Sequence, residues 1–263
     1  MIEFLQNKDV FSWEIITILI SIGFIVGFIN TLAGSGSVLN LSLFDMLGLP
    51  ISIANGTLRL GVIFQTLVAS LNYRKHKVLD LKTAISISIP SVIGSICGAI
   101  ISVKLEEDLL KTIIAVMLLI LLIPLCIKPQ KWLEGQEGLF KDKPSILQYV
   151  IFFIIGFYGG FIHIGVGIFL LSALVLVTGF DLVKANAIKV FIVLLYSPFA
   201  LFIFMLSGNI DYKIGLISAI GNVTGGYFAS KLSINIGSGF IRWFMIFIIL
   251  LFSSKLLGFW ELV

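Results

Sequence analysis

Two basic side chains lie inside long apolar stretches of this sequence. Arg59 follows Asn55-Gly56-Thr57, and Lys189 follows Lys184-Ala185-Asn186. Ionisable residues are costly within a membrane span, so by default they indicate function. Two cations at matching depths suggest a site for an anionic substrate. The structural alternative is that either side chain reaches the interface or holds the carbonyl groups of a helix end.

Two glycine-rich segments interrupt the apolar stretches, Gly34-Ser35-Gly36-Ser37 and His163-Ile164-Gly165-Val166-Gly167. Non-helical backbone at membrane depth is tolerated only where it is buried in protein or lines a wet cavity. A half-helix that starts there presents free N–H groups and a positive dipole end, which suit an anion. A single glycine of this kind more often serves helix crossing, but a break in both halves favours a binding site. His163 is either a ligand contact or proton carrier, or a satisfied structural group.

Neutral polar residues complete the candidate site, although many of them could simply form interhelical hydrogen bonds. The predicted substrate-binding residues are Arg59, Asn30, Gly34, Ser35, Gly36, Ser37, Asn55, Thr57, Gln65, His163, Gly165, Gly167, Asn186, Lys189 and Tyr196. The sequence contains no H-E-x-x-H, no P-loop and no serine nucleophile elbow. We therefore expect no enzyme activity, no catalytic residues, no metal and no cofactor.

Composition indicates a membrane protein, because 59% of the residues are hydrophobic and only 12% are charged, against roughly 25% in soluble domains. Apart from the few inside apolar segments, such as Arg59 and Lys189, the Lys and Arg residues lie in the gaps between segments, which is typical of topology signals and not of a nucleic-acid surface. The pattern predicts an all-α polytopic protein of the cytoplasmic membrane, in contact with lipid. Its apolar segments cover residues 15–33, 38–54, 57–72, 83–103, 109–127, 146–162, 164–180, 186–207, 214–229 and 239–258.

The two halves of the chain can be aligned with each other. The matching positions are Phe24–Phe28 with Phe153–Phe157, Gly36 with Gly165, Asn55 with Asn186, Asp80 with Asp211, Gly94 with Gly225, and Lys111 with Arg242. Shared apolar composition would not align these rarer residues in order. The sequence predicts a first membrane repeat over residues 1–127, a cytoplasmic connector over 128–145 and a second repeat over 146–263. Each repeat has about five hydrophobic segments and a broken or re-entrant helix.

The loops predict that the repeats are inverted. The most basic loops are Arg74–Lys77 and the connector that contains Lys128, Lys131, Lys141 and Lys143, which places both in the cytoplasm. The acidic turn Glu106–Asp108 then lies outside, and each half crosses the membrane an odd number of times. Both termini are expected on the external side.

The chain resembles the sulfite exporter TauE/SafE family of membrane permeases over about residues 15–258. The similar segments are Gly27–Ser37, Ala54–Arg59, Tyr73–Val78 and Gly156–Phe161. The resemblance implies two homologous halves and the export or uptake of sulfite, sulfonates or other small, often sulfur-containing, anions.

A secondary transporter that moves a small anion by alternating access is the leading hypothesis, because inverted repeats with paired helix breaks supply two gates around one midplane site. Two alternatives remain open: an anion channel, and a non-transporting membrane component of a partner complex. The expected partners are a small anion and membrane lipid, with no nucleic acid. A coupling ion and a homo-oligomer are both compatible with this interpretation.

The inverted topology can be tested by cysteine labelling with a membrane-impermeant reagent in intact cells. We expect Gln136→Cys to be protected, because the connector is cytoplasmic, and Glu3→Cys and Glu261→Cys to be labelled. Labelling at position 136 together with protected termini would contradict the inversion and favour halves of parallel orientation.

Overall fold

The computed structural model describes residues 10–120 and 144–236, and within these ranges every regular element is a helix. This agrees with the predicted all-α class. The helices are α2 (Trp13–Leu32), α3 (Ser37–Met46), α4 (Ile51–Lys75), α5 (Leu81–Ser102), α6 (Glu107–Ile120), α8 (Ile146–Phe161), α9 (Val166–Leu176), α10 (Leu182–Leu206) and α11 (Tyr212–Ile236).

Four of these helices, α2, α4, α5 and α10, are long and apolar enough to cross a membrane. The helices that follow the two glycine-rich breaks are much shorter, since α3 has 10 residues and α9 has 11. At 1.5 Å per residue they extend about 15–17 Å, roughly half of the hydrocarbon core. Neither can cross the membrane alone, as expected for the short second and seventh apolar segments.

Two helix starts differ from the sequence-based boundaries. The third segment was expected from residue 57, but α4 begins at Ile51, directly after Pro50. Pro50 provides no side-chain cap, and the carboxylate of Glu107 on α6 accepts hydrogen bonds from the first backbone N–H groups of α4 instead. The helix α10 begins at residue 182, where the Asp181 carboxylate accepts from the N–H groups of Val183 and Lys184. Asn55 therefore lies within α4 rather than before it, and Asn186 lies in the second turn of α10 rather than at its first residue.

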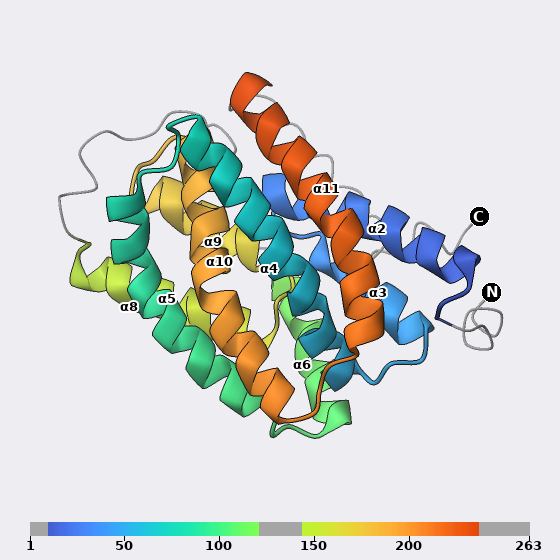
Figure 1. The fold of residues 1–263 in the computed structure, drawn as a ribbon. Helices are drawn as coiled ribbons and strands as arrows, with labels where there is room; N and C mark the ends of the chain where they lie inside the picture. Colours follow the sequence, from blue (N-terminus) through green and yellow to red (C-terminus); the bar gives the residue numbers. More distant parts are fainter. Residues whose placement is uncertain (1–9, 121–143, 237–263) are drawn as a thin grey trace.

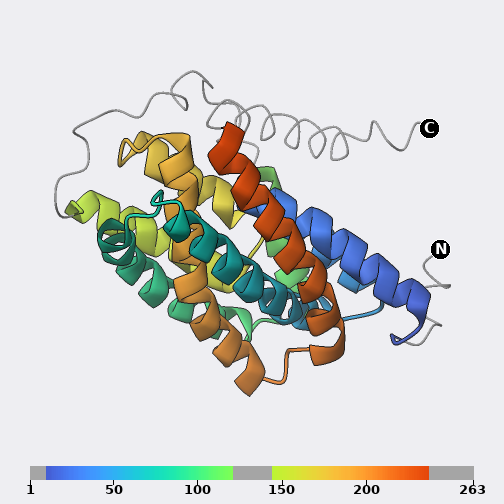
Figure 2. The same ribbon diagram turned by 45° about the horizontal axis from the view of Figure 1, so that its top comes forward.

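The long helices pack as two outer pairs around a central pair (Figures 1 and 2). Helices α2 and α11 form one outer pair, α5 and α8 form the other, and α4 lies against α10 between them. The central helices are antiparallel. The Asn186 side chain near the start of α10 donates to the hydroxyl of Tyr73 near the end of α4, at 2.8 Å. Gly56 near the start of α4 packs against Phe204 near the end of α10.

Each outer pair crosses at glycine. A Cβ atom on Gly94 of α5 would lie 2.1 Å from the carbonyl oxygen of Phe153 on α8, and one on Gly225 of α11 would lie 2.0 Å from the carbonyl oxygen of Phe24 on α2. Such separations leave no room for any side chain, so the helix backbones are in contact. Small residues at crossings are typical of membrane helices, because packing rather than the hydrophobic effect joins them. The connector and the tenth predicted segment lie almost wholly outside the described residues.

Because the outer helix pairs are closely packed at glycine, even a methyl group added at the crossing should lower the stability of the protein. Gly94→Ala should lower the midpoint of thermal unfolding, because the added methyl group overlaps a backbone oxygen and overpacking costs about 1–3 kcal/mol. The adjacent Ile93→Ala is the matched control, since Ile93 is exposed to the surroundings of the bundle. Melting in detergent, followed by size-exclusion chromatography, measures both. Equal stability of the two variants would show that α5 and α8 are not held at this crossing.

Candidate functional site

The two glycine-rich breaks touch each other in the middle of the bundle. The first runs from the end of α2 at Leu32 to Ser37, and the second from the end of α8 at Phe161 to Val166. Gly34 and Gly165 have φ angles of +83° and +66°, a region that favours glycine. A Cβ on Gly34 would lie 2.3 Å from the Cα of Gly167. The predicted breaks are therefore real interruptions, and they share one backbone contact.

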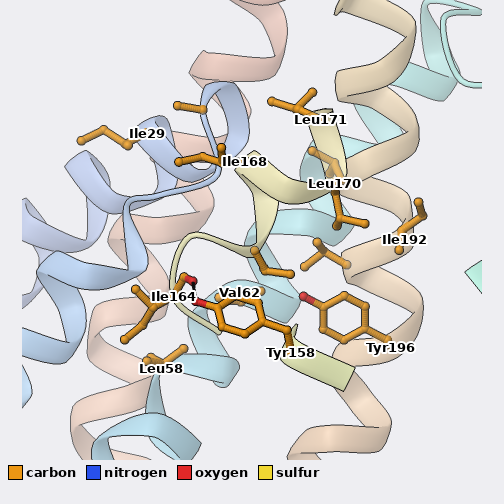
Figure 3. Close-up of a cluster of buried hydrophobic side chains, with 14 of the residues drawn as sticks. Ile29, Leu58, Val62, Tyr158, Ile164, Ile168, Leu170, Leu171, Ile192 and Tyr196 are labelled. Carbon is orange, nitrogen blue, oxygen red and sulfur yellow. Dashed lines mark hydrogen bonds between the residues drawn. The ribbon is translucent and has the colours of Figure 1, made fainter. Parts of the chain in front are cut away.

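Side chains hold each break in its shape. In the first, the amide oxygen of Asn30 accepts from the N–H of Ser37 at 3.1 Å, and its nitrogen donates to the Ser37 hydroxyl at 3.0 Å. In the second, the hydroxyl of Tyr158 donates to the carbonyl of Ile164 at 2.6 Å (Figure 3). These bonds replace the helical hydrogen bonds that the breaks have lost.

The two buried cations bind the ends of the broken helices. The Lys189 ammonium donates to the carbonyls of Asn30 and Thr31 at 3.1 and 2.8 Å, in the last turn of α2. This arrangement corresponds to the structural alternative considered from the sequence. It satisfies carbonyl groups that a helix end leaves unpaired, and it places positive charge at the negative end of the helix dipole.

Arg59 makes the corresponding contacts at the end of α8. Its two terminal nitrogens donate to the carbonyls of Gly159 and Gly160 at 3.1 and 2.6 Å. The guanidinium also lies 4.6 Å from the ring centre of Phe204, and its Nε atom is buried without a hydrogen-bond partner. Both terminal nitrogens of Arg59 thus donate to backbone carbonyls, and the third nitrogen is buried by the protein.

A cavity opens where the breaks meet. The volume that a water-sized sphere can occupy there is about 20 Å³, which is enough for about one water molecule. Its lining comes from both breaks and both central helices, and contains no Asp or Glu within the described ranges. The lining residues are Asn30, Gly34, Val62, Gln65, Thr66, His163, Val166, Gly167, Lys189, Val190 and Val193.

Three polar features of the cavity could bind an oxyanion. Lys189 supplies a cation that has two of its three donors bound to carbonyls. Val166 and Gly167, the first residues of α9, bring in a helix start that has no side-chain cap. Gln65 is buried, and one of the two N–H groups of its amide nitrogen donates to the Thr31 hydroxyl at 3.1 Å, which leaves the other as a potential donor to an anion. Positive charge and amide groups without any lining carboxylate suit an anion.

Six predicted site residues line this cavity: Asn30, Gly34, Gln65, His163, Gly167 and Lys189. The other nine do not. Four of them belong to the breaks but do not line the cavity, namely Ser35, Gly36, Ser37 and Gly165. The other five lie elsewhere on the central helices, namely Arg59, Asn55, Thr57, Asn186 and Tyr196.

Most of these nine residues have partners within the protein. Asn55 donates to the carbonyl of Phe161 at 2.9 Å, and the Thr57 hydroxyl accepts from the N–H of Asp211 at 2.8 Å. Tyr196 hydrogen-bonds through its hydroxyl to Nδ1 of His163 at 3.1 Å. Their predicted roles as direct substrate contacts stay predictions.

Sequence reasoning did not single out five lining residues, namely Val62, Thr66, Val166, Val190 and Val193. Four are valines, which carry no chemical signal in an apolar chain. Thr66 follows Gln65 directly, and Val190 follows Lys189. Their position next to a predicted polar residue in the chain is the only signal in the sequence that could have located these two.

Comparison with known proteins identifies a family. The sequence profile described as sulfite exporter TauE/SafE matches residues 19–256. No solved structure matches the chain significantly.

The relatives include three proteins that are each named a probable membrane transporter protein. One from a Sinorhizobium species is 25% identical, over 94% of this chain and 94% of that protein. One from Haemophilus influenzae is 25% identical, over 92% and 94% respectively. One from Bacillus subtilis is 28% identical, over 82% and 86%. The similarity thus extends along nearly the full length of the chains compared.

The contacts of Arg59 predict that its loss destabilises the protein. Arg59→Gln should lower the melting temperature, because each lost charge-assisted hydrogen bond costs about 1.5–3 kcal/mol. Arg59→Lys should recover part of the loss. Lys111→Gln, which removes an exposed cation from α6, is the control and should have little effect. The same melts with an anion that protects the unaltered chain test the other role: normal melting but lost protection in Arg59→Gln would make Arg59 a substrate contact.

Proposed function

We propose that this chain, which belongs to the sulfite exporter TauE/SafE family, is a secondary transporter that moves a small anion across the cell membrane by alternating access. Membership of the family and four apolar helices of spanning length make it a multi-pass membrane protein. The names of its relatives make it a membrane transporter. The substrate and the mechanism are the proposal.

The cavity between the breaks is the observation that carries the proposal. A single small space is lined by a cation, by an uncapped helix start and by an amide, with no lining carboxylate in the described ranges. Buried charge of one sign is expensive unless a counter-charge compensates it. The two carbonyls bound to Lys189 offer only partial charges. An incoming anion would supply the remainder.

Sulfite, a sulfonate or another small organosulfur anion fits these donors. Such groups carry several oxygens around one centre, and each oxygen can accept a hydrogen bond. The third donor of Lys189 and the first N–H groups of α9 would bind the charged oxygens. The valines of the lining would contact the apolar part of a sulfonate. A space that a water-sized sphere can occupy over only about 20 Å³ favours a small substrate over a large one.

Alternating access requires two related halves, and several contacts support inverted repeats. The alignment that pairs Phe24–Phe28 with Phe153–Phe157 also pairs Asn30 with Gly159 and Thr31 with Gly160. These are the residues whose carbonyls bind Lys189 and Arg59, respectively. The glycine crossings of the two outer pairs repeat in the same way, at Gly94 and Gly225. The antiparallel central helices α4 and α10 agree with an inversion.

The proposal predicts that Lys189 is needed for flux. In proteoliposomes that contain the purified protein, uptake of sulfite or methanesulfonate should saturate and show counterflow. Lys189→Gln should weaken the apparent affinity by roughly ten- to a hundredfold, because one charge-assisted bond to the anion is lost. Lys184→Gln, one turn earlier on the same helix and outside the cavity lining, is the matched control and should transport normally.

Other outcomes favour the alternative functions. High flux that does not saturate would favour a channel. Absence of flux for every anion tested, with folded protein in the membrane, would favour a component of a partner complex. Normal affinity in Lys189→Gln would remove Lys189 from the substrate site, since the helix end would then be its only role.

A further inference from the structure

The cavity lies on one side of the contact between the two breaks. Along α4 its lining runs from Val62 to Gln65 and Thr66, and along α10 it runs from Val193 back to Lys189 and Val190. Because the two helices are antiparallel, the later residues of α4 and the earlier residues of α10 lie towards the same end of the bundle. The cavity therefore extends from the centre towards the end of the bundle that carries the basic loop after Tyr73.

Further along α10, away from the end with the basic loop, the position equivalent to Gln65 is filled by Tyr196, which bonds to the cavity-lining His163. The alignment that pairs Asn55 with Asn186 also pairs Gln65 with Tyr196 and Thr66 with Ser197. Tyr196 is fully buried, and its ring lies among the side chains around the second break (Figure 3). Its hydroxyl bonds to His163, and a Cβ on Gly159 would lie only 2.8 Å from that hydroxyl oxygen. A rigid ring thus occupies the position that corresponds to a cavity-lining glutamine.

Two buried polar atoms, one on a residue near Tyr196 and one on the residue that follows it, lack hydrogen-bond partners. Arg59 donates to the carbonyl of Gly159, and Gly159 lies directly beside the Tyr196 hydroxyl. The Nε of Arg59 and the hydroxyl of Ser197 are both fully buried, and neither has a hydrogen-bond partner. Buried polar groups are nearly always hydrogen-bonded. Arg59 lies near Tyr196 and Ser197 follows it in the chain, so a different rotamer of Tyr196 would give both atoms room for a partner.

We infer that Tyr196 covers a second half-site for the same class of small oxyanion, open to the membrane face opposite the visible cavity. This inference rests on the proposed function. When the Tyr196 ring leaves His163, the Nε of Arg59 and the hydroxyl of Ser197 become donors for the anion, as Lys189 and the start of α9 are in the visible half. Tyr196 is then the gate residue, and the structure shows the state in which it is closed.

Two reporter cysteines at paired positions test the inference. Thr66→Cys lies in the visible cavity and Ser197→Cys in the filled half-site, each in a chain whose natural cysteines are replaced by Cys97→Ser and Cys126→Ser. A membrane-impermeant methanethiosulfonate is applied to right-side-out and to inside-out vesicles. We expect the two cysteines to react from opposite faces, and Ser197→Cys to react at least tenfold more slowly.

Exchange of the gate residues sharpens the test. Tyr196→Gln places in the filled half the residue found in the open half, so labelling of Ser197→Cys should accelerate at least tenfold. Gln65→Tyr is the matched reverse change, and it should slow the labelling of Thr66→Cys by a similar factor. Tyr196→Phe keeps the ring and loses only the bond to His163, so its effect should be intermediate. Size-exclusion profiles identify any variant that fails to fold, and the remaining exchange then decides.

Two results would overturn the half-site. One is that Ser197→Cys in folded Tyr196→Gln protein reacts no faster than in the unaltered background. The other is that Ser197→Cys and Thr66→Cys react from the same face. Labelling needs no substrate, so it is separate from the flux measurements of the proposed function. If flux is absent while labelling responds as expected, the transport proposal fails and the gate stands; if flux is present while labelling does not respond, the gate fails alone.

Discussion

The unpaired carbonyl groups of interrupted helices are the constraint on which the rest of this structure depends. In lipid, backbone polar groups must find partners inside the protein. Helices α2 and α8 both end within the bundle, and both would leave carbonyls without donors. Lys189 and Arg59 provide those donors from the central helices. The breaks can therefore exist only because a cation from the other half of the chain reaches each of them, so the two buried charges, the breaks and the packing of α4 against α10 form a single arrangement.

The same arrangement explains how a structural cation can also serve a substrate. An ammonium has three donors in no fixed plane, so Lys189 can bind two carbonyls and still present one donor to the cavity. The planar guanidinium of Arg59 directs two nitrogens to carbonyls, lies over the ring of Phe204, and keeps its third nitrogen buried without a partner. The difference between the two sides of the protein is thus chemical as well as steric. Lys189 faces the cavity, whereas Arg59 is enclosed by the protein.

Much of this organisation was predictable from the sequence, and the limits have physical causes. Glycine runs in apolar segments predicted both breaks, and the rarity of buried charge singled out Arg59 and Lys189. The sequence could not decide between carbonyl binding and substrate binding for these cations, because both use the same donors and the partners are distant in the chain. The early start of α4 was missed because its cap is Glu107, on a different helix. The valines of the cavity were missed because an apolar side chain in an apolar chain carries no distinguishing mark.

The direct contact of Gly34 with Gly167 has a mechanical consequence. Because no side chain separates the two backbones, neither break can be displaced towards the other, and a shift of one must be passed on without loss. Flexible side chains between the breaks could change rotamer and so accommodate a small displacement, but two main chains in direct contact cannot. The short helices α3 and α9 are attached directly to these breaks, so they behave as two arms on a common pivot. A rearrangement that tilts one arm would then tilt the other, so this contact joins the motions of the two halves in the same rigid way as the glycine crossings of the outer pairs.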